Sequence, residues 1–361
     1  MNVRGRIGLQ QRVLPAYRAP FFDHLASRCP EGLSIGAGDP RLGESIVPAA
    51  GLEVARWEHL RNVHPLGGPL FLCLQTGWRA WLETWDPRVL ILEAAPRYLT
   101  NWQAAAWMRK RRRPVLGWGL GAPSQRGVGG VFRRAFNRRL DGAIAYSRRG
   151  AAEYVQSGLP QDRVWIAPNA VVSAPEELRR NPPSPEQPRR VIFVGRLQAR
   201  KRVDVLLEAC AGLRPTPEIY IVGDGPAKDR LERKAAALGA RARFFGAVHG
   251  RALEDLLDSA DLFVLPGTGG LAAQQAMARG LPLIIAEGDG TQEDLVSPDN
   301  GWLVPPGDAD ALRRRLHEAL ADPDRLRAMG QASYRLAREK FNLDAMVEVF
   351  VRVLTEIGVR G

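Results

Sequence analysis

The chain has 361 residues, enough for about two domains that each bury a core, and its hydrophobic share of 45% favours a globular protein. Its three scattered cysteines exclude a disulfide framework and a cysteine-based zinc site. A formal charge of +12 favours anionic partners, and three classes fit: nucleotide phosphates, anionic lipid and nucleic acid.

The sequence also bears on the compartment. The opening segment MNVRGRIGLQQRVLP is too polar for a secretory signal, and no apolar run reaches the roughly 18 residues that span a bilayer. Cys29, Cys73 and Cys210 are expected to be buried thiols in a reducing compartment. These features together predict a cytoplasmic chain.

The first half of the chain alternates short apolar strands with helices. Strands are predicted at Arg6–Val13, Leu33–Gly36, Leu52–Trp57, Val89–Glu93, Pro114–Trp118, Gly142–Tyr146 and Val164–Ala167. Helices are predicted at Phe21–Arg28, Leu70–Glu83, Trp102–Arg112 and Val131–Arg139. This alternation is typical of a mostly parallel sheet covered on both faces, so residues 1–171 are predicted to form one doubly wound α/β domain.

A proline-rich polar segment, residues 172–189, is predicted to be an interdomain linker. The alternation then restarts and predicts a second Rossmann-like domain over residues 190–340. Its strands are predicted at Val191–Val194, Glu218–Val222, Ala242–Phe245, Leu262–Leu265 and Pro282–Ala286. A C-terminal helix in 341–361 is expected to pack back on the first domain. Two such domains would face a cleft, with the ligand at the carboxyl ends of the strands of both sheets.

The stretch Asp261–Gly290 carries the strongest chemical signal. A buried strand runs into Gly267-Thr268-Gly269-Gly270, which opens a helix through Met277. Glycines let backbone N–H groups approach an anion, and the first helical turn adds unpaired N–H donors. The stretch therefore predicts a phosphate site, although a tight turn between strand and helix needs glycine as well.

Two further loops follow strands of the second domain. Gly195 and Arg196 follow the first strand, with Lys201 five residues after Arg196 at the start of the next helix. Gly223 and Gly225 follow the second strand. Two cations beside glycine loops favour a diphosphate ligand over isolated surface charges.

At this point the residues become recognisable. VGRLxxxK, GDGP, FFGxV, QAMARGLPLI and NGWLVPPGDADAL, in this order from Arg190 to about Leu320, resemble the nucleotide-binding half of family-4-type (group 1) GT-B glycosyltransferases. The resemblance implies two Rossmann-like domains facing a cleft. It also implies transfer of a sugar from a nucleotide diphosphate with retention of configuration, without a metal or other cofactor.

The resemblance assigns the donor site. Arg196 and Lys201 would neutralise the diphosphate as the leaving group departs. Backbone amides of four residues would contact phosphate and sugar hydroxyls, namely Thr268, Gly269, Gly270 and Leu271. Gln275 stands at one of two positions where relatives carry glutamate, and its amide can still bind ribose hydroxyls.

At the other glutamate position this chain has Gly267, which lacks a carboxylate. Glu287 is the candidate acid in its place, with Asp289, Glu293 and Asp294 as alternatives in the same loop. In the first domain, Arg18 is expected to reach the diphosphate, and Glu93 or Arg97 to contact donor sugar or acceptor. Glu93 and Glu287 thus join Arg196 and Lys201 as catalytic candidates.

Two other charged features have simpler interpretations. Asp308-Ala309-Asp310 imitates a metal-binding DxD but opens a helix, where acids cap N–H groups, so no metal site is predicted. The arginines of 109–113 and 133–139 stand among tryptophans and phenylalanines, which suits an anionic membrane surface. Solvated helical faces would have the same composition.

The sequence predicts a retaining hexosyltransferase that moves a sugar from a nucleotide-diphosphate sugar to a glycan or lipid-linked acceptor. Its role would be the synthesis of a bacterial surface or exported polysaccharide at the inner face of the membrane. A GT-B sugar-nucleotide epimerase is an alternative, and so is a catalytically silent GT-B partner subunit, which the missing carboxylate at Gly267 favours. Nucleic acid is not expected as a partner, because no recognised binding module accompanies the charge.

Overall fold

The computed structural model describes residues 3–360 except 42, 45, 66–70, 123–126 and 179–187. The chain divides into two compact units. Unit 1 comprises Met1–Val171 with Leu343–Gly361, and unit 2 comprises Val172–Asn342. The predicted linker falls at the start of unit 2, and its residues 179–187 lie outside the described part of the chain.

Unit 1 is built on a seven-stranded sheet in the order β3-β2-β1-β6-β7-β8-β9, with every neighbouring pair parallel. The strands are β1 (Ile7–Val13), β2 (Leu33–Gly38), β3 (Arg56–His59), β6 (Val89–Glu93), β7 (Val115–Gly119), β8 (Gly142–Ala145) and β9 (Val164–Ile166). The pair β4 (Arg61–Val63) and β5 (Leu74–Thr76) forms a small antiparallel sheet.

Helices cover both faces of the unit 1 sheet. They are α1 (Ala19–Ser27), α2 (Trp78–Trp85), α3 (Leu99–Lys110), α4 (Val128–Asn137), α5 (Arg148–Gln156) and α13 (Leu343–Arg360). Strand β6 shows why two layers are needed: Val89 and Ile91 pack into the core that contains α1 and α13, while Leu90 and Leu92 pack into the core that contains α2 and α3. Alternate residues of a strand point to opposite faces, so a strand that is apolar throughout requires cover on both sides.

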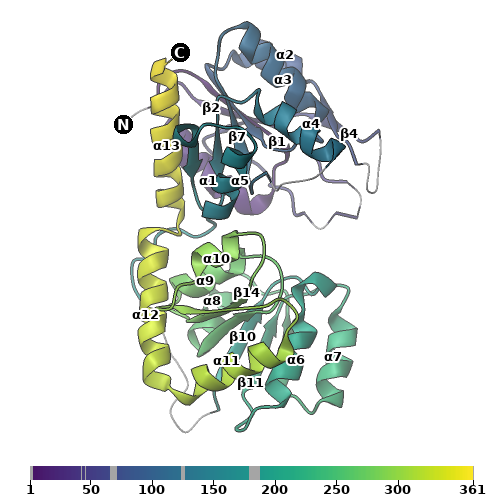
Figure 1. The fold of residues 1–361 in the computed structure, drawn as a ribbon, viewed down its shortest axis with the longest axis vertical. Coiled ribbons are helices and arrows are strands. Elements are labelled where there is room, and N and C mark those ends of the chain that lie inside the picture. Colours follow the sequence, from purple (N-terminus) through teal and green to yellow (C-terminus); the bar gives the residue numbers. More distant parts are fainter. Residues whose placement is uncertain are drawn as a thin grey trace. The chain divides into compact units, whose positions relative to one another are not determined.

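The C-terminal helix α13 completes unit 1. It lies along α1 (Figure 1), and its buried side chains recur at helical spacing. They are Leu343, Met346, Val347, Phe350, Val351, Val353, Leu354 and Ile357. Phe350 stacks edge-on against Phe21 and Trp118, with ring centroids 5.0 and 5.2 Å away.

One predicted helix in unit 1 is wrong in its first half. The sequence predicts a helix over 70–83, but Leu74–Thr76 forms strand β5 and the helix begins only at Trp78; Leu70 itself lies outside the described residues. Gly77 has a φ of +86°, which no right-handed helix contains. Buried Gln75 accepts a 2.8 Å hydrogen bond from Gln10 of β1, and this contact draws the segment towards the sheet.

Unit 2 contains a six-stranded parallel sheet in the order β12-β11-β10-β13-β14-β15. The strands are β10 (Arg190–Val194), β11 (Glu218–Val222), β12 (Ala242–Gly246), β13 (Leu262–Leu265), β14 (Leu283–Ala286) and β15 (Gly301–Val304). The helices are α6 (Val203–Ala211), α7 (Lys228–Ala237), α8 (Gly250–Asp258), α9 (Leu271–Ala278), α10 (Thr291–Leu295), α11 (Ala309–Ala321) and α12 (Pro323–Glu339).

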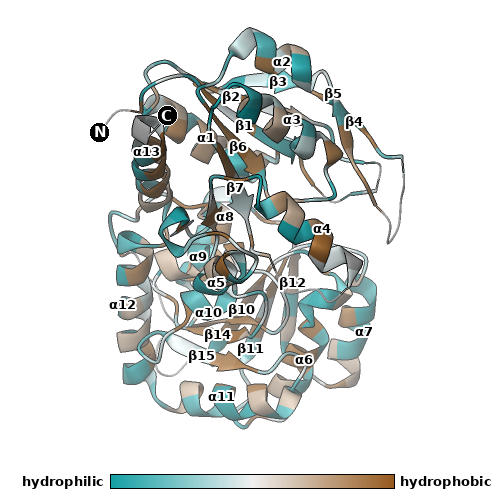
Figure 2. Cartoon of the chain, turned by 45° about the horizontal axis from the view of Figure 1, so that its top comes forward, coloured by the Kyte–Doolittle hydropathy of each residue, from teal (hydrophilic) through white to brown (hydrophobic). Residues whose placement is uncertain are grey.

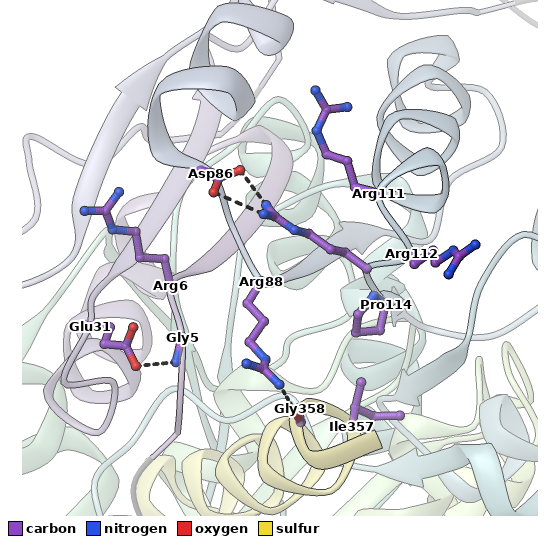
Figure 3. A pocket seen from close by; sticks show the side chains of 11 residues that line it. Gly5, Arg6, Glu31, Asp86, Arg88, Arg111, Arg112, Pro114, Ile357 and Gly358 are labelled. Carbon is purple, nitrogen blue, oxygen red and sulfur yellow. Dashed lines mark hydrogen bonds and ion pairs between the residues drawn. The ribbon is translucent and has the colours of Figure 1, made fainter. Parts of the chain in front are cut away.

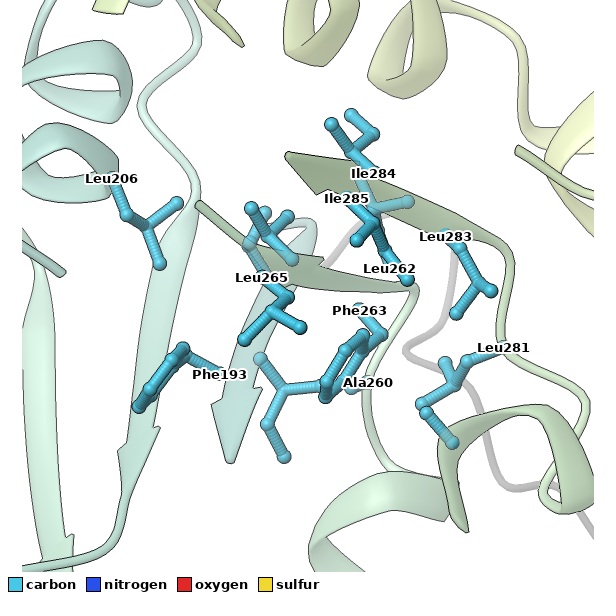
Figure 4. Packing of buried hydrophobic residues seen from close by; sticks show 14 of the residues in the cluster. Phe193, Leu206, Ala260, Leu262, Phe263, Leu265, Leu281, Leu283, Ile284 and Ile285 are labelled. Atoms are coloured by element: carbon cyan, nitrogen blue, oxygen red, sulfur yellow. The ribbon is translucent and has the colours of Figure 1, made fainter. Parts of the chain in front are cut away.

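The strands of unit 2 are apolar, whereas its covering helices alternate polar and apolar residues (Figure 2). In the core, Phe193 of β10 and Leu206 of α6 pack beside the side chains of β13 and β14 (Figure 4). Every residue of β13 and β14 is buried, as expected for central parallel strands. The predicted fold class, two Rossmann-like α/β sheets, is confirmed.

Candidate functional site

The strand order of unit 2 locates a candidate site. Strand β10 is first in sequence, and the chain moves away from it on one side through β11 and β12 and on the other through β13, β14 and β15. The loops after β10 and β13 therefore leave in opposite directions at the carboxyl edge of the sheet. Open α/β sheets bind ligands at this kind of switch point.

Lys201 lies at the switch point. Its Nζ donates a 2.6 Å hydrogen bond to the carbonyl oxygen of Thr268, and Arg200 Nη1 donates to Thr268 Oγ1 over 3.1 Å. The backbone N–H of Thr268 in turn donates to the carbonyl oxygen of Arg200. Burial and, next, the charge of Arg200 lower the pKa of Lys201 to about 8, with Asp289 acting in the opposite sense. Lys201 is thus a partly buried cation with a neutral hydrogen-bond acceptor.

Two glycines allow these loops to meet. A β-carbon at Gly267 would stand 2.6 Å from the carbonyl carbon of Lys201 and closer still to the carbonyl oxygen of Arg200. A β-carbon at Gly269, whose φ is +118°, would overlap Nζ of Lys201. The absence of a carboxylate at position 267 therefore has a structural reason, since the backbone of residues 200 and 201 fills the space a side chain would need.

The loop after β11 interlocks with the loop after β10. The N–H of Leu197 donates to the carbonyl oxygen of Asp224 over 2.8 Å, and a β-carbon at Gly223 would overlap the carbonyl oxygen of Gly195. A β-carbon at Gly225 would stand 2.5 Å from the carbonyl oxygen of Leu197. These contacts fix the backbone on both sides of Arg196.

The remaining candidate residues of the donor loops are exposed or half-buried. Arg196 is exposed, and no ion pair is described for it within the residues that the structure covers. Gly270 precedes the first residue of α9, Leu271, so the free N–H groups of this helix begin beside Lys201. Gln275 is half-buried one turn further on. The structure thus brings Lys201 together with Thr268 and Gly269, and it does not bond Arg196 to them.

The loop after β14 contains the acidic candidates. They differ in whether their carboxylates already accept hydrogen bonds within the protein. The carboxylate of Glu293 accepts from the N–H groups of Gly288 and Gly290, so it caps α10. Asp289 accepts from the hydroxyl of Thr291 over 2.6 Å. Glu287 is exposed, and no side-chain hydrogen bond is described for it in the covered part of the chain.

Gln292 was not singled out by sequence reasoning. It is fully buried, and its Nε2 donates to the carbonyl oxygen of Gly269 over 3.0 Å while its Oε1 accepts from the N–H of Asp289. Gln292 therefore joins the loop after β14 to the glycine loop. Helix α10 has the sequence TQEDL, so Gln292 stands among polar residues and no pattern along the chain indicated its burial.

Unit 1 has its own switch point, between β1 and β6. Arg18, which follows β1, is only 8% exposed; its Nη2 donates to the hydroxyl of Tyr146 over 2.6 Å, and its guanidinium lies 4.3 Å from the ring centroid of Trp118. No hydrogen-bond partner is described for its buried Nη1 in the part of the chain that the structure covers. Arg18 is therefore a buried cation without a carboxylate partner.

Glu93 ends β6, next to β1. Its Oε2 accepts a 3.0 Å hydrogen bond from the N–H of Arg12, and its Oε1 lies 3.4 Å from the hydroxyl of Tyr98. The backbone of the neighbouring strand thus orients this carboxylate. Arg97, in the loop that follows, is exposed.

Other features bear on metals and membranes. Within the described residues, no group of three or more His, Cys, Asp and Glu side chains is placed to hold a metal ion. Asp308 Oδ1 accepts from the N–H of Ala311 over 2.8 Å, so this residue caps α11 as predicted. The three cysteines are buried free thiols. Among the described helices, none is both long and apolar enough to cross a bilayer.

Comparison with known proteins gives the family. Residues 174–336 match the model of the glycosyl transferases group 1. A phosphatidyl-myo-inositol mannosyltransferase of Mycolicibacterium smegmatis is 33% identical over 215 residues, which are 57% of this chain and 55% of that protein. The putative colanic acid biosynthesis glycosyltransferase WcaL of Salmonella typhimurium is 28% identical over 235 residues, 61% of this chain and 58% of that protein. The chain thus spans little more than half the length of these curated relatives.

Solved structures show the fold over the whole chain. The lipopolysaccharide outer core galactosyltransferase WaaB superposes with a TM-score of 0.75 at 14% identity, covering 97% of this chain and 99% of that chain. HepE of Anabaena, solved in complex with UDP, superposes with a TM-score of 0.74 at 18% identity, covering 99% and 100%. Residues 174–336 therefore match the group 1 glycosyl transferases, and the chain as a whole has the GT-B fold.

Proposed function

We propose that this chain is a glycosyltransferase that takes a hexosyl group from a nucleotide-diphosphate sugar. The observation that carries the proposal is Lys201, a partly buried cation held at the switch point of unit 2 beside a glycine loop and the start of α9. A diphosphate would give Lys201 an anionic partner in addition to the neutral carbonyl oxygen that it now bonds. The similar protein HepE is described in complex with UDP and with UDP-glucose, which supports a nucleotide-sugar donor.

In this proposal the residues of the donor site bind the nucleotide sugar and stabilise its leaving group. Lys201 and Arg196 stabilise the charge that grows on the diphosphate as the bond from the sugar C1 to the phosphate oxygen breaks. The N–H groups of Gly269, Gly270 and Leu271 bind the phosphate and sugar oxygens, and Gln275 binds the ribose hydroxyls. The acceptor hydroxyl forms the new bond on the same face of C1, and its proton passes to the departing diphosphate, so configuration is retained. No metal ion is needed.

The acidic and first-unit candidates complete the site. Glu287 is the free carboxylate of the loop after β14 and would bind hydroxyls of the donor sugar. Glu93 and Arg18 stand at the switch point of unit 1 and would act on the acceptor and the donor, respectively. The acceptor is proposed to be a glycan or lipid-linked sugar of a bacterial surface or exported polysaccharide.

Donor binding is tested by thermal unfolding in the presence of UDP, GDP, ADP, CMP or dTDP. The wild type should be stabilised by one nucleotide, and the Arg196→Ala, Lys201→Ala double variant should lose that shift. An Arg335→Ala, Arg338→Ala variant removes the same charge from exposed positions of α12 and should keep it. A well-folded protein with no shift for any nucleotide would contradict the proposal and favour a catalytically silent subunit.

We further propose that α4 contacts an anionic membrane surface from the cytoplasmic side. Val131 is 58% and Phe132 40% exposed, and Arg134, Arg138 and Arg139 are exposed beside them. An apolar strip bordered by arginines suits the headgroup region of anionic lipid. Co-sedimentation with phosphatidylglycerol vesicles should be lost in Phe132→Glu, and unchanged binding of that variant would contradict this surface.

A further inference from the structure

A cavity of about 600 Å³ opens at the edge of unit 1 opposite to Arg18 and Glu93. Its lining comes from the segments that precede β2, β1, β6 and β7, at the amino ends of four neighbouring strands, and from the end of α13 (Figure 3). The volume lies in the range of small-molecule sites. No residue of the donor site or of the switch point in unit 1 belongs to it.

The lining carries a strong excess of positive charge. Five arginines line it, namely Arg6, Arg88, Arg111, Arg112 and Arg113, against the two carboxylates of Glu31 and Asp86, a net of +3. Helices α2, α3 and α13 end nearby, and their carboxyl ends offset about half a charge each at most. The excess therefore remains after the helix dipoles are counted.

The two carboxylates are already engaged. Asp86 accepts from both terminal nitrogens of Arg113 over 2.5 and 3.1 Å, and Glu31 accepts from the N–H of Gly5 over 2.6 Å. Within the described residues, no ion pair is formed by the other four arginines of the lining.

Three of these arginines are oriented without being neutralised. Arg88 Nη2 donates to the carbonyl oxygen of Gly358 over 2.7 Å (Figure 3). The guanidinium of Arg111 lies 3.6 Å from the ring centroid of Trp107, and that of Arg6 lies 5.3 Å from that of Trp85. Stacked guanidinium groups with free N–H donors are suited to bind phosphate oxygens in pairs.

The backbone conformation of Arg112 is unusual for this residue type. Arg112 follows α3 with a φ of +55°, the N–H of Arg112 donates to the carbonyl oxygen of Arg109, and the N–H of Arg113 donates to that of Met108. This hydrogen-bond pattern ends many helices, and glycine is the favoured residue at the position that Arg112 occupies. An exposed arginine there works against this backbone preference.

We propose that this cavity is a second anion site, which binds a ligand with more than one phosphate group. The site is separate from the proposed donor site, and the proposal stands whether or not the chain transfers a sugar. A soluble phosphorylated metabolite and a phosphorylated lipid headgroup would present the same chemistry to Arg111 and Arg112.

The test uses pyrophosphate as the probe and the full chain carrying Arg196→Ala and Lys201→Ala, so that the donor site cannot contribute. Calorimetric titration near physiological salt should show saturable one-to-one binding. Arg112→Gly should weaken it at least tenfold without lowering the melting temperature, because glycine suits the backbone. Arg109→Gln, one turn earlier and outside the lining, removes the same charge and should leave affinity within about twofold.

Vesicles that contain cardiolipin, a lipid with two phosphates in its headgroup, separate the two sources. Pyrophosphate that displaces the chain from vesicles, together with loss of vesicle binding in Arg112→Gly, would assign the phosphate to lipid. Binding of pyrophosphate without such competition would assign it to a soluble ligand. No saturable binding, or an equal loss in Arg109→Gln and Arg112→Gly, would overturn the site.

Discussion

Lys201 and Gly269 are in such close contact that the amine of the lysine occupies the space a β-carbon at position 269 would need. The same nitrogen is bonded to the carbonyl oxygen of Thr268, so a single side chain closes the glycine loop against the loop after β10. A phosphate that binds the free amides of residues 269–271 would meet this amine directly. The contact therefore links the shape of the loop to its charge.

Introducing at position 267 the glutamate that the family resemblance predicts should harm this protein. Gly267→Glu places a β-carbon against the backbone of residues 200 and 201, which cannot move without breaking the Thr268 contacts. We expect unfolding free energy to fall by about 1–3 kcal/mol, with no gain in activity. Chemical denaturation measures the change. Gly51→Ala, where a β-carbon meets open space, is the control, and enhanced turnover in Gly267→Glu would contradict the assignment.

Nucleotide affinity should depend on the charge of Lys201. Its pKa in the unliganded protein is lowered to about 8, chiefly by burial, and a bound diphosphate would raise it, so binding takes up a proton above pH 8. Affinity should be constant below about pH 7 and fall up to tenfold per pH unit above pH 8. Calorimetry in buffers of different ionisation enthalpy reports the proton uptake. Lys201→Arg should flatten the profile, and a wild-type profile without a step would exclude this role.

Replacing Arg18 should lower activity without lowering the stability of the protein. Its buried Nη1 is without a described partner and no carboxylate neutralises it, so an apolar residue of similar length removes a desolvation cost. Arg18→Met is expected to keep or raise the melting temperature and to lower nucleotide-sugar turnover at least tenfold. A variant that melts several degrees earlier and turns over normally would show that Arg18 serves the fold alone.

The C-terminal helix should contribute strongly to the stability of unit 1. Phe350 is fully buried against Phe21 and Trp118, so Phe350→Ala leaves a cavity and should cost about 3–5 kcal/mol. Arg352 is exposed on the same helix, and Arg352→Ala should change stability by no more than about 0.5 kcal/mol. Urea titration followed by circular dichroism compares the two. Equal effects would show that α13 is not packed as described.

Local sequence patterns were sufficient to predict the fold class and the glycine loop. Strands such as Val89–Glu93 are apolar on both faces, and the glycines after Leu265 stand out without any tertiary information. The family resemblance, confirmed by the match of residues 174–336, rests on short motifs of this kind.

Long-range contacts account for what the sequence did not predict. The strand at Leu74–Thr76 pairs with Arg61–Val63, and its Gln75 also bonds to Gln10, which lies 65 residues away. Gly267 is explained only by the backbone of residues 200 and 201, and Gln292 only by its bond to Gly269. Neither propensity nor periodicity contains such pairings, because both describe neighbours along the chain.

The position of α13 has a consequence for synthesis. Because unit 1 needs residues 343–361, it cannot be completed until all 171 residues of unit 2 have been made. At about 5–20 residues per second, this interval lasts roughly 10–30 s. During that time Phe21, Phe22 and Leu25 of α1 lack the helix that covers them. Unit 1 therefore finishes folding only after unit 2 has been synthesised, and until then this apolar face of α1 is uncovered.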